Sequence, residues 1–92
     1  MKESYIYILT NKYRTTFYIG ITANISKRMI EHKEKIASKF TERYNTSDLI
    51  YFEKFTDINQ AISREKQLKN WRKEWKINLI KKLNPTLDTL NY

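Results

Sequence analysis

Residues 5–32, YIYILTNKYRTTFYIGITANISKRMIEH, decide the fold of this chain. The segment holds two runs rich in aromatic and β-branched residues, 5–10 and 17–22, a composition typical of β-strands. The six polar residues between them predict an antiparallel hairpin with a long loop. Both runs are nearly continuous in apolar residues, so we expect both faces of the hairpin to be partly covered.

A helix is predicted directly after the hairpin, with Thr22 or Asn24 as its N-cap and an end before residue 38. The row expected to face the sheet is Ile25, Met29, Lys33 and Ile36. Arg28 and His32 also lie one turn apart, on a neighbouring face of the helix. We therefore expect both of them at the edge of the sheet rather than far out in solvent.

The single glycine of the chain, Gly20, lies inside the second run. Glycine weakens a strand but lets another group approach its backbone closely. Two interpretations stand side by side: a bulge or tight helix crossing, or room for a substrate or a catalytic side chain.

Farther along, the pattern predicts a polar loop over 38–47, a strand over 48–55 and helices over 57–69 and 73–83. The order β-β-α-β-α-α predicts an α+β fold, a small three-stranded antiparallel sheet flanked by helices. The length of 92 residues predicts one domain, residues 1–92, with a modest core. The tail after Pro85 carries Leu87 and Leu90 and is a candidate for weak docking on that core.

The formal net charge of +8 favours a polyanionic partner, and nucleic acid before a membrane surface, although general solubility charge is the alternative. The chain has no cysteine, which excludes disulfides, thiolate metal sites and cysteine nucleophiles. No apolar run approaches the roughly 20 residues that span a bilayer, and the N-terminus is too polar for a signal peptide. We expect a soluble cytoplasmic protein without a membrane partner.

Positive charge is concentrated in residues 66–82, where seven basic residues stand against one acidic residue. This surface is either the solvated side of two helices or a phosphate-tracking surface. The candidate nucleic-acid contacts are Lys66, Lys69, Arg72, Lys73 and Lys76. Helical spacing, with Trp75, Leu79 and Leu83 on one face, favours core roles for Trp71 and Trp75 over base stacking.

One carboxylate stands out on the helix over 57–69. The apolar row of that helix is Ile58, Ala61, Ile62 and Leu68, and Glu65 occupies a position of the same row. A carboxylate on a packed face costs free energy unless it is paired, hydrogen-bonded or metal-bound. Spacing alone favours an edge glutamate that reaches solvent or pairs with a neighbour such as Arg64 or Lys69.

The ordered set of motifs resembles the GIY-YIG nuclease superfamily, most closely its small single-domain bacterial branch. Tyr5-Ile6-Tyr7 and Tyr18-Ile19-Gly20 resemble its two signature tripeptides, although the first begins with tyrosine where the family name has glycine. Arg28 and His32 match the family arginine and the following histidine-or-tyrosine position, and Glu65 matches its metal-binding glutamate. Residues 38–41 and 64–66 extend the resemblance.

The resemblance implies a one-metal DNA endonuclease. Glu65 would hold Mg²⁺ or Mn²⁺, and Tyr18, or Tyr7 with a water, would act as general base. Arg28 would stabilise charge on the phosphate, while His32 would orient a tyrosine or relay a proton. This implication favours the metal-ligand interpretation of Glu65. A late asparagine often found near the family's site matches Asn78 or Asn84, and spacing does not decide between them.

The expected function is therefore metal-dependent hydrolysis of DNA phosphodiester bonds, on branched or damaged DNA in repair or recombination. The alternatives are a nucleic-acid-binding module that does not cut and an accessory subunit of a repair assembly. Specificity would come from the basic helices, the 38–47 loop, a partner protein or the structure of the DNA.

Overall fold

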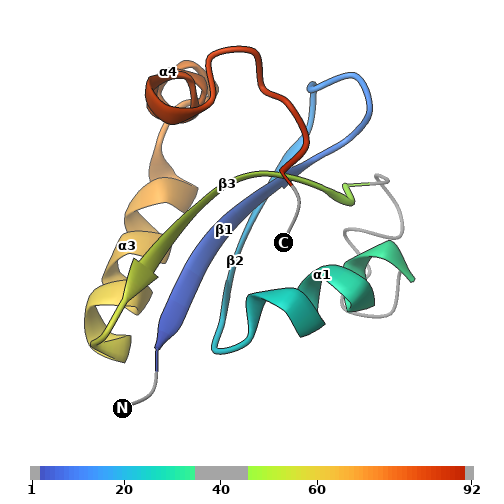
Figure 1. Cartoon of the computed structure of the whole chain (residues 1–92). Helices are drawn as coiled ribbons and strands as arrows, with labels where there is room; N and C mark the ends of the chain where they lie inside the picture. The colour runs from blue at the N-terminus through green and yellow to red at the C-terminus, as the bar shows by residue number, and fades with distance from the viewer. Residues whose placement is uncertain (1–2, 35–45, 91–92) are drawn as a thin grey trace.

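The computed structural model describes residues 3–34 and 46–90, and its elements follow the predicted order (Figure 1). They are β1 (Ser4–Thr10), β2 (Phe17–Thr22), α1 (Ile25–Lys33), β3 (Asp48–Phe55), α3 (Ile58–Asn70) and α4 (Lys73–Leu83). The α+β class and the element order are confirmed. Ile36 and most of the predicted 38–47 loop lie outside the described residues.

The three strands form one antiparallel sheet with β1 in the centre, in the order β2-β1-β3. Helix α1 lies on one face of the sheet and α3 on the other (Figure 1). Successive residues of a strand point to opposite faces. Tyr7 and Leu9 of β1 accordingly pack on the α1 side, whereas Ile6 and Ile8 pack on the α3 side.

Each face of the sheet carries its own buried cluster. The cluster on the α1 side comprises Tyr7, Leu9, Ile25, Met29 and Leu49. The cluster on the α3 side comprises Ile6, Ile8, Ile19, Ile50, Tyr51, Ala61, Leu68 and Ile80. Both faces of the hairpin are thus covered, as its apolar runs predict. The Asn24 side chain caps α1 by accepting a hydrogen bond of 3.0 Å from the Lys27 amide.

The residues predicted to face the core from α3 and α4 are only partly those that the structure buries. Ile58 and Ile62 are exposed, and α3 buries only Ala61 and Leu68. In α4 the buried residue is Ile80, whereas Trp75 and Leu83, predicted to face the core, are exposed.

The turn between α3 and α4 gives the physical reason. Trp71 and Arg72 both have extended backbone, so α4 starts in a new direction. The helix then approaches the sheet by its Ile80 side, and Trp71 alone of the two tryptophans packs partly against the core.

The C-terminal tail crosses from the α3 side to the α1 side of the sheet (Figure 1). Leu87 packs against the cluster on the α3 side and Leu90 against the cluster on the α1 side. The Leu90 amide donates to the Leu49 carbonyl at 2.7 Å. The buried Asn84 side chain donates to the Ile50 carbonyl at 3.0 Å. These bonds fix the tail to β3.

Arg14 of the β1–β2 loop holds the same tail from the other side. Its guanidinium donates to the Leu87 carbonyl at 3.0 Å and pairs with the Asp48 carboxylate at 2.6 Å.

In the described part of the chain, every helix is too short or too polar to cross a membrane.

Candidate active site

Tyr7 and His32 form a buried pair between β1 and α1. The Tyr7 hydroxyl and His32 Nε2 share a hydrogen bond of 3.0 Å, and both residues are 0% exposed. Their rings meet edge to face with centroids 5.6 Å apart. His32 Nδ1 has no hydrogen-bond partner among residues 3–34 and 46–90. The pair therefore ties the helix to the central strand through one polar contact in an apolar cluster.

Gly20 makes room for this pair. It lies directly opposite Tyr7 in the register of β1 and β2. A methyl group on Gly20 would overlap the Tyr7 hydroxyl and would stand 2.9 Å from the Tyr7 Cε1 atom. The φ angle of Gly20 is not positive, so its backbone does not itself demand glycine. Of the two interpretations of this glycine, the structure supports space for a side chain, and that side chain is Tyr7.

Tyr18 completes a group of three rings. It lies two residues before Gly20 on β2, on the same face of the sheet, and is half-buried. Its ring centroid is 6.3 Å from that of Tyr7 and 5.5 Å from that of His32. Two strands and one helix thus each contribute one ring.

Arg28 lies one turn before His32 on α1. Its Nε lies 3.1 Å from the Glu31 carboxylate, but without the alignment of a hydrogen bond to any described residue. Burial raises the pKa of Tyr7 above the usual tyrosine value, and the negative charge of Glu65 acts in the same direction. The Arg28 guanidinium opposes this rise in the pKa of Tyr7 through its charge and through hydrogen bonding.

Glu65 lies on α3, near enough for its charge to act on Tyr7. Its side chain is 17% exposed, and its carboxylate stands 3.5 Å from the Lys69 ammonium, which is 54% exposed. The structure therefore groups Tyr7, Tyr18 and His32 in ring contact, with Arg28 and Glu65 near enough for their charges to act on Tyr7. The predicted pairing of Glu65 with Lys69 is present as well.

The two late asparagines lie elsewhere. Asn84 is committed to the tail, because its amide donates to the Ile50 and Asp88 carbonyls. Asn78 is exposed on α4 and borders a hollow with Trp71 and Trp75.

The arrangement fits a single divalent cation at Glu65. Residues 3–34 and 46–90 contain no group of three or more His, Cys, Asp or Glu side chains able to hold a metal ion. Mg²⁺, however, is commonly held by one or two carboxylates, with waters and substrate phosphates as its other ligands. Glu65 is mostly buried beside Tyr7 and is paired with a cation that is mainly in solvent. Its carboxylate therefore suits an ion of this kind.

A hollow of about 300 Å³ lies beside Tyr18, bordered by Phe17, Tyr18, Ile19, Lys69 and Lys76. Lys76 is half-buried there, and burial lowers its pKa. A phosphate group would meet two ammonium groups in this hollow.

The other predicted nucleic-acid contacts have different surroundings. Lys73 donates to the Thr15 carbonyl at 2.7 Å, and Lys66 and Arg72 are exposed.

The sequence pattern did not predict two features near the site. Glu31 pairs with Arg28, and Trp75 is exposed.

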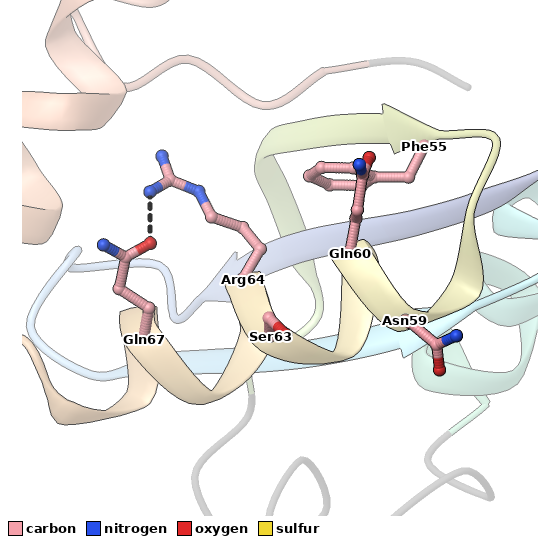
Figure 2. A pocket seen from close by; sticks show the side chains of 6 residues that line it. All are labelled: Phe55, Asn59, Gln60, Ser63, Arg64 and Gln67. Atoms are coloured by element: carbon pink, nitrogen blue, oxygen red, sulfur yellow. Dashed lines mark hydrogen bonds between the residues drawn. The ribbon is translucent and has the colours of Figure 1, made fainter.

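A roomier hollow, of about 630 Å³, lies on the β3 flank of α3 (Figure 2). It is bordered by Phe55, Asn59, Gln60, Ser63, Arg64 and Gln67. The Arg64 guanidinium there already donates to Glu53 at 2.9 and 3.0 Å and to Gln67 at 2.8 Å. With its cation committed to Glu53, this hollow offers little for phosphate chemistry.

The environment of His32 predicts a specific pH dependence of stability. Burial, with the charge of Arg28 adding to it, lowers the pKa of His32 from the ordinary 6.5 to about 4, and Glu31 opposes the shift. Between about pH 4 and pH 6.5, the unfolded chain therefore binds a proton on His32 while the folded chain does not. Stability from this residue is intact above pH 6.5 and falls as the pH drops toward 4.

We expect the wild type to lose roughly 2–3 kcal/mol more than a His32→Asn variant between pH 7 and pH 4.5. Urea denaturation followed by circular dichroism at a series of pH values measures the difference. Parallel losses in the two proteins would contradict the buried, neutral state of His32.

Comparison with known proteins identifies the family of this chain. A family model described as the GIY-YIG catalytic domain matches residues 3–78. A UPF0213 protein of Syntrophus aciditrophicus is 35% identical over 86 residues, covering 92% of this chain and 97% of the relative. A UPF0213 protein of Staphylococcus saprophyticus is 32% identical over 80 residues, covering 87% and 96%.

Among solved structures, the solution NMR structure of the UPF0213 protein BH0048 from Bacillus halodurans has a TM-score of 0.60. It is 23% identical and covers 91% of this chain and 88% of that one, so it supports the fold. The family model, which implies nuclease-type activity and general use of a divalent metal, spans both signature tripeptides, Arg28, His32 and Glu65. This chain belongs to the GIY-YIG catalytic domain family.

Proposed function

We propose that this protein is a metal-dependent endonuclease that hydrolyses phosphodiester bonds in DNA. The observation that carries the proposal is the gathering of Tyr18, Arg28, His32 and Glu65 around the Tyr7 hydroxyl. Phosphodiester hydrolysis needs a group that takes a proton from water, cationic groups that meet the growing charge on the phosphate, and a group that helps the leaving oxygen. The gathered side chains offer these chemical types.

Glu65 would hold the divalent cation, Mg²⁺ or Mn²⁺, which when bound supplies Lewis-acid stabilisation of charge on the phosphate and the leaving oxygen. Lys69 would then exchange its contact with Glu65 for a phosphate oxygen of the substrate. The half-buried Lys76 on the far side of the hollow gives that phosphate a second cationic partner.

Arg28 would donate hydrogen bonds to the scissile phosphate. A guanidinium is planar and presents paired N–H groups that match phosphate oxygens. Its Nε is buried without an aligned hydrogen-bond partner among the described residues, and its guanidinium is paired with Glu31 at 3.1 Å. Arg28 is thus held in place while it keeps donor capacity for a substrate.

Tyr18 would take the proton from the attacking water. Tyr7, together with His32, would position the Tyr18 side chain. Tyr18 is the half-buried tyrosine that borders the hollow, whereas Tyr7 is fully buried and bonded to His32. A tyrosine works as a base near neutral pH only beside a cation that favours its ionised form. Arg28 and the bound cation would meet that need.

The substrate class follows from the charge of α3 and α4. The proposed contacts Lys66, Lys69, Arg72, Lys73 and Lys76 are cations suited to phosphates, and phosphate contacts carry no sequence information. We therefore extend the proposal to DNA recognised by its structure, such as the branched or damaged DNA of repair and recombination. A partner protein would be the other source of specificity.

A cleavage assay on Arg28 tests the function. Supercoiled, branched and single-stranded DNA are incubated with Mg²⁺ or Mn²⁺ and with wild type, Arg28→Ala or Lys27→Ala. Lys27 is the exposed neighbour on the same helix and serves as the matched control. We expect the wild type and Lys27→Ala to cut equally and Arg28→Ala to lose at least about 100-fold in rate.

Two results would contradict the proposal. Equal cutting by all three proteins would identify a contaminating nuclease. Salt-dependent DNA binding without cutting of any substrate would instead identify a binding module.

A further inference from the structure

Trp75 is an exposed aromatic residue with a second indole behind it. It is 51% exposed on α4, and the Trp71 ring meets it edge to face with centroids 6.1 Å apart. The two tryptophans border a hollow of about 220 Å³ with Asn78, Leu79 and Lys82. Indole is the largest side chain a protein can bury, so a tryptophan left half in solvent beside a hollow is typical of a binding surface.

Cations surround this aromatic pair. The Arg72 guanidinium lies 5.7 Å from the Trp75 ring centroid. The Arg64 guanidinium lies 5.3 Å from the Trp71 ring centroid. Arg64 is paired with Glu53, which within the described residues leaves Arg72 as the unneutralised guanidinium of the two. Residues 66–82 carry seven basic residues and one acidic residue. A partner that covers Trp75 therefore needs negative charge as well as a flat apolar face.

Along the chain, the aromatic pair adjoins the hollow beside Tyr18 in which we propose that a phosphate binds. Lys76, the residue after Trp75, borders the hollow beside Tyr18, and Lys69, two residues before Trp71, borders it from the opposite helix. Alternation of cations with exposed aromatic rings suits an unpaired nucleic-acid strand, whose phosphates meet the cations and whose bases stack on the rings. In a duplex, the faces of the bases are already stacked on one another.

We propose that Trp75, backed by Trp71, is a stacking site for an unpaired nucleobase of a DNA strand whose phosphates bind Lys69 and Lys76. The Asn78 amide at the rim of the hollow has both a donor and an acceptor for the edge of such a base. Lys82, on the same rim, would meet a neighbouring phosphate. This inference rests on the proposed action on DNA and adds preference for single-stranded regions near the cleaved bond.

Binding in the presence of a chelator tests the stacking site without cleavage. The probes are a labelled single strand of eight thymidines, an abasic strand of the same length and charge, and a duplex. The chain contains two tryptophans, Trp71 and Trp75, so its indole fluorescence reports directly on this surface. Anisotropy of the labelled strand gives the affinity.

For the wild type, we expect quenching of fluorescence by the thymidine strand and about five-fold or more tighter binding than to the abasic strand. Trp75→Leu should bind both strands alike, and Trp75→Phe should restore part of the difference. The matched control is Tyr13→Leu, which removes an exposed aromatic residue beside Lys12 in the β1–β2 loop and should keep the full preference.

Equal affinity of the wild type for the two strands, or a base preference that survives in Trp75→Leu, would overturn the stacking site. Absence of binding to any strand would overturn it too and would point to a protein partner for this surface. Cleavage without base preference would refute the stacking site alone. Base preference without cleavage by the wild type would refute the proposed function alone.

Discussion

Replacing Glu65 with Gln should lower the rate of DNA cleavage by at least about 10³-fold, because the variant loses the carboxylate that would hold the divalent cation. Glutamine keeps the size of the side chain and its place on α3, so the fold should survive. Glu65 is the acidic group that acts on Tyr7 in the described structure, and Lys69 is its ion-pair partner. Single-turnover cleavage at saturating Mg²⁺ or Mn²⁺ measures the loss.

Glu74→Gln is the matched control for this change. Glu74 is an exposed acidic residue in the first turn of α4, so its replacement removes the same charge from the same region of the chain. We expect Glu74→Gln to cut at the wild-type rate. A Glu65→Gln variant that also retains full activity would leave the proposed site without its metal ligand.

Gly20→Ala should cost about 1–3 kcal/mol of stability and most of the cleavage activity. The added methyl would occupy the space of the Tyr7 hydroxyl and ring, which cannot move freely because Tyr7 is fully buried. Tyr7 would shift, and its hydrogen bond to His32 would lengthen or break. Thermal denaturation and the cleavage assay measure the two effects.

A double-mutant cycle with Tyr7→Leu isolates the cause, because leucine lacks the ring that the methyl would strike. In the Tyr7→Leu background, Gly20→Ala should cost far less stability than in the wild type. If the two costs simply add, the close approach of Tyr7 is not the reason for glycine at position 20.

The hairpin and the first helix were predictable because local signals agree with the final packing. The runs 5–10 and 17–22 are aromatic and β-branched, and Asn24 has the side chain that a helix N-cap needs. Ile25 and Met29 are buried as their spacing indicates. In the hairpin and the first helix, local secondary-structure propensity and tertiary packing favour the same structure.

The helices after β3 were less predictable, because spacing shows which residues share a face but not which face meets the sheet. In α3 the small side chain of Ala61 allows close contact, and the flanking Ile58 and Ile62 stay in solvent. The direction of the α4 axis depends on the extended backbone of Trp71 and Arg72, and the spacing of apolar residues does not indicate that conformation. Trp75 was for this reason assigned to the core, where the structure does not place it.

The residues of the candidate site could be chosen from the sequence through resemblance, whereas their mutual arrangement could not. Glu65 lies 33 positions beyond His32, and only the packing of α3 against the sheet brings it near Tyr7. The meaning of Gly20 likewise depends on strand register, which sets it opposite Tyr7. Long-range pairing of this kind leaves no local pattern in a single sequence.

We propose that Glu65 holds a divalent cation near Tyr7, Tyr18 and His32. Titration of the isotope-labelled protein with Mn²⁺, followed by NMR, tests it directly, because the paramagnetic ion broadens the signals of nearby nuclei. We expect selective broadening of the signals of Glu65, Gly20 and the His32 ring, and loss of this broadening in Glu65→Gln. Broadening centred elsewhere, or broadening that persists unchanged in Glu65→Gln, would show that Glu65 does not hold the ion.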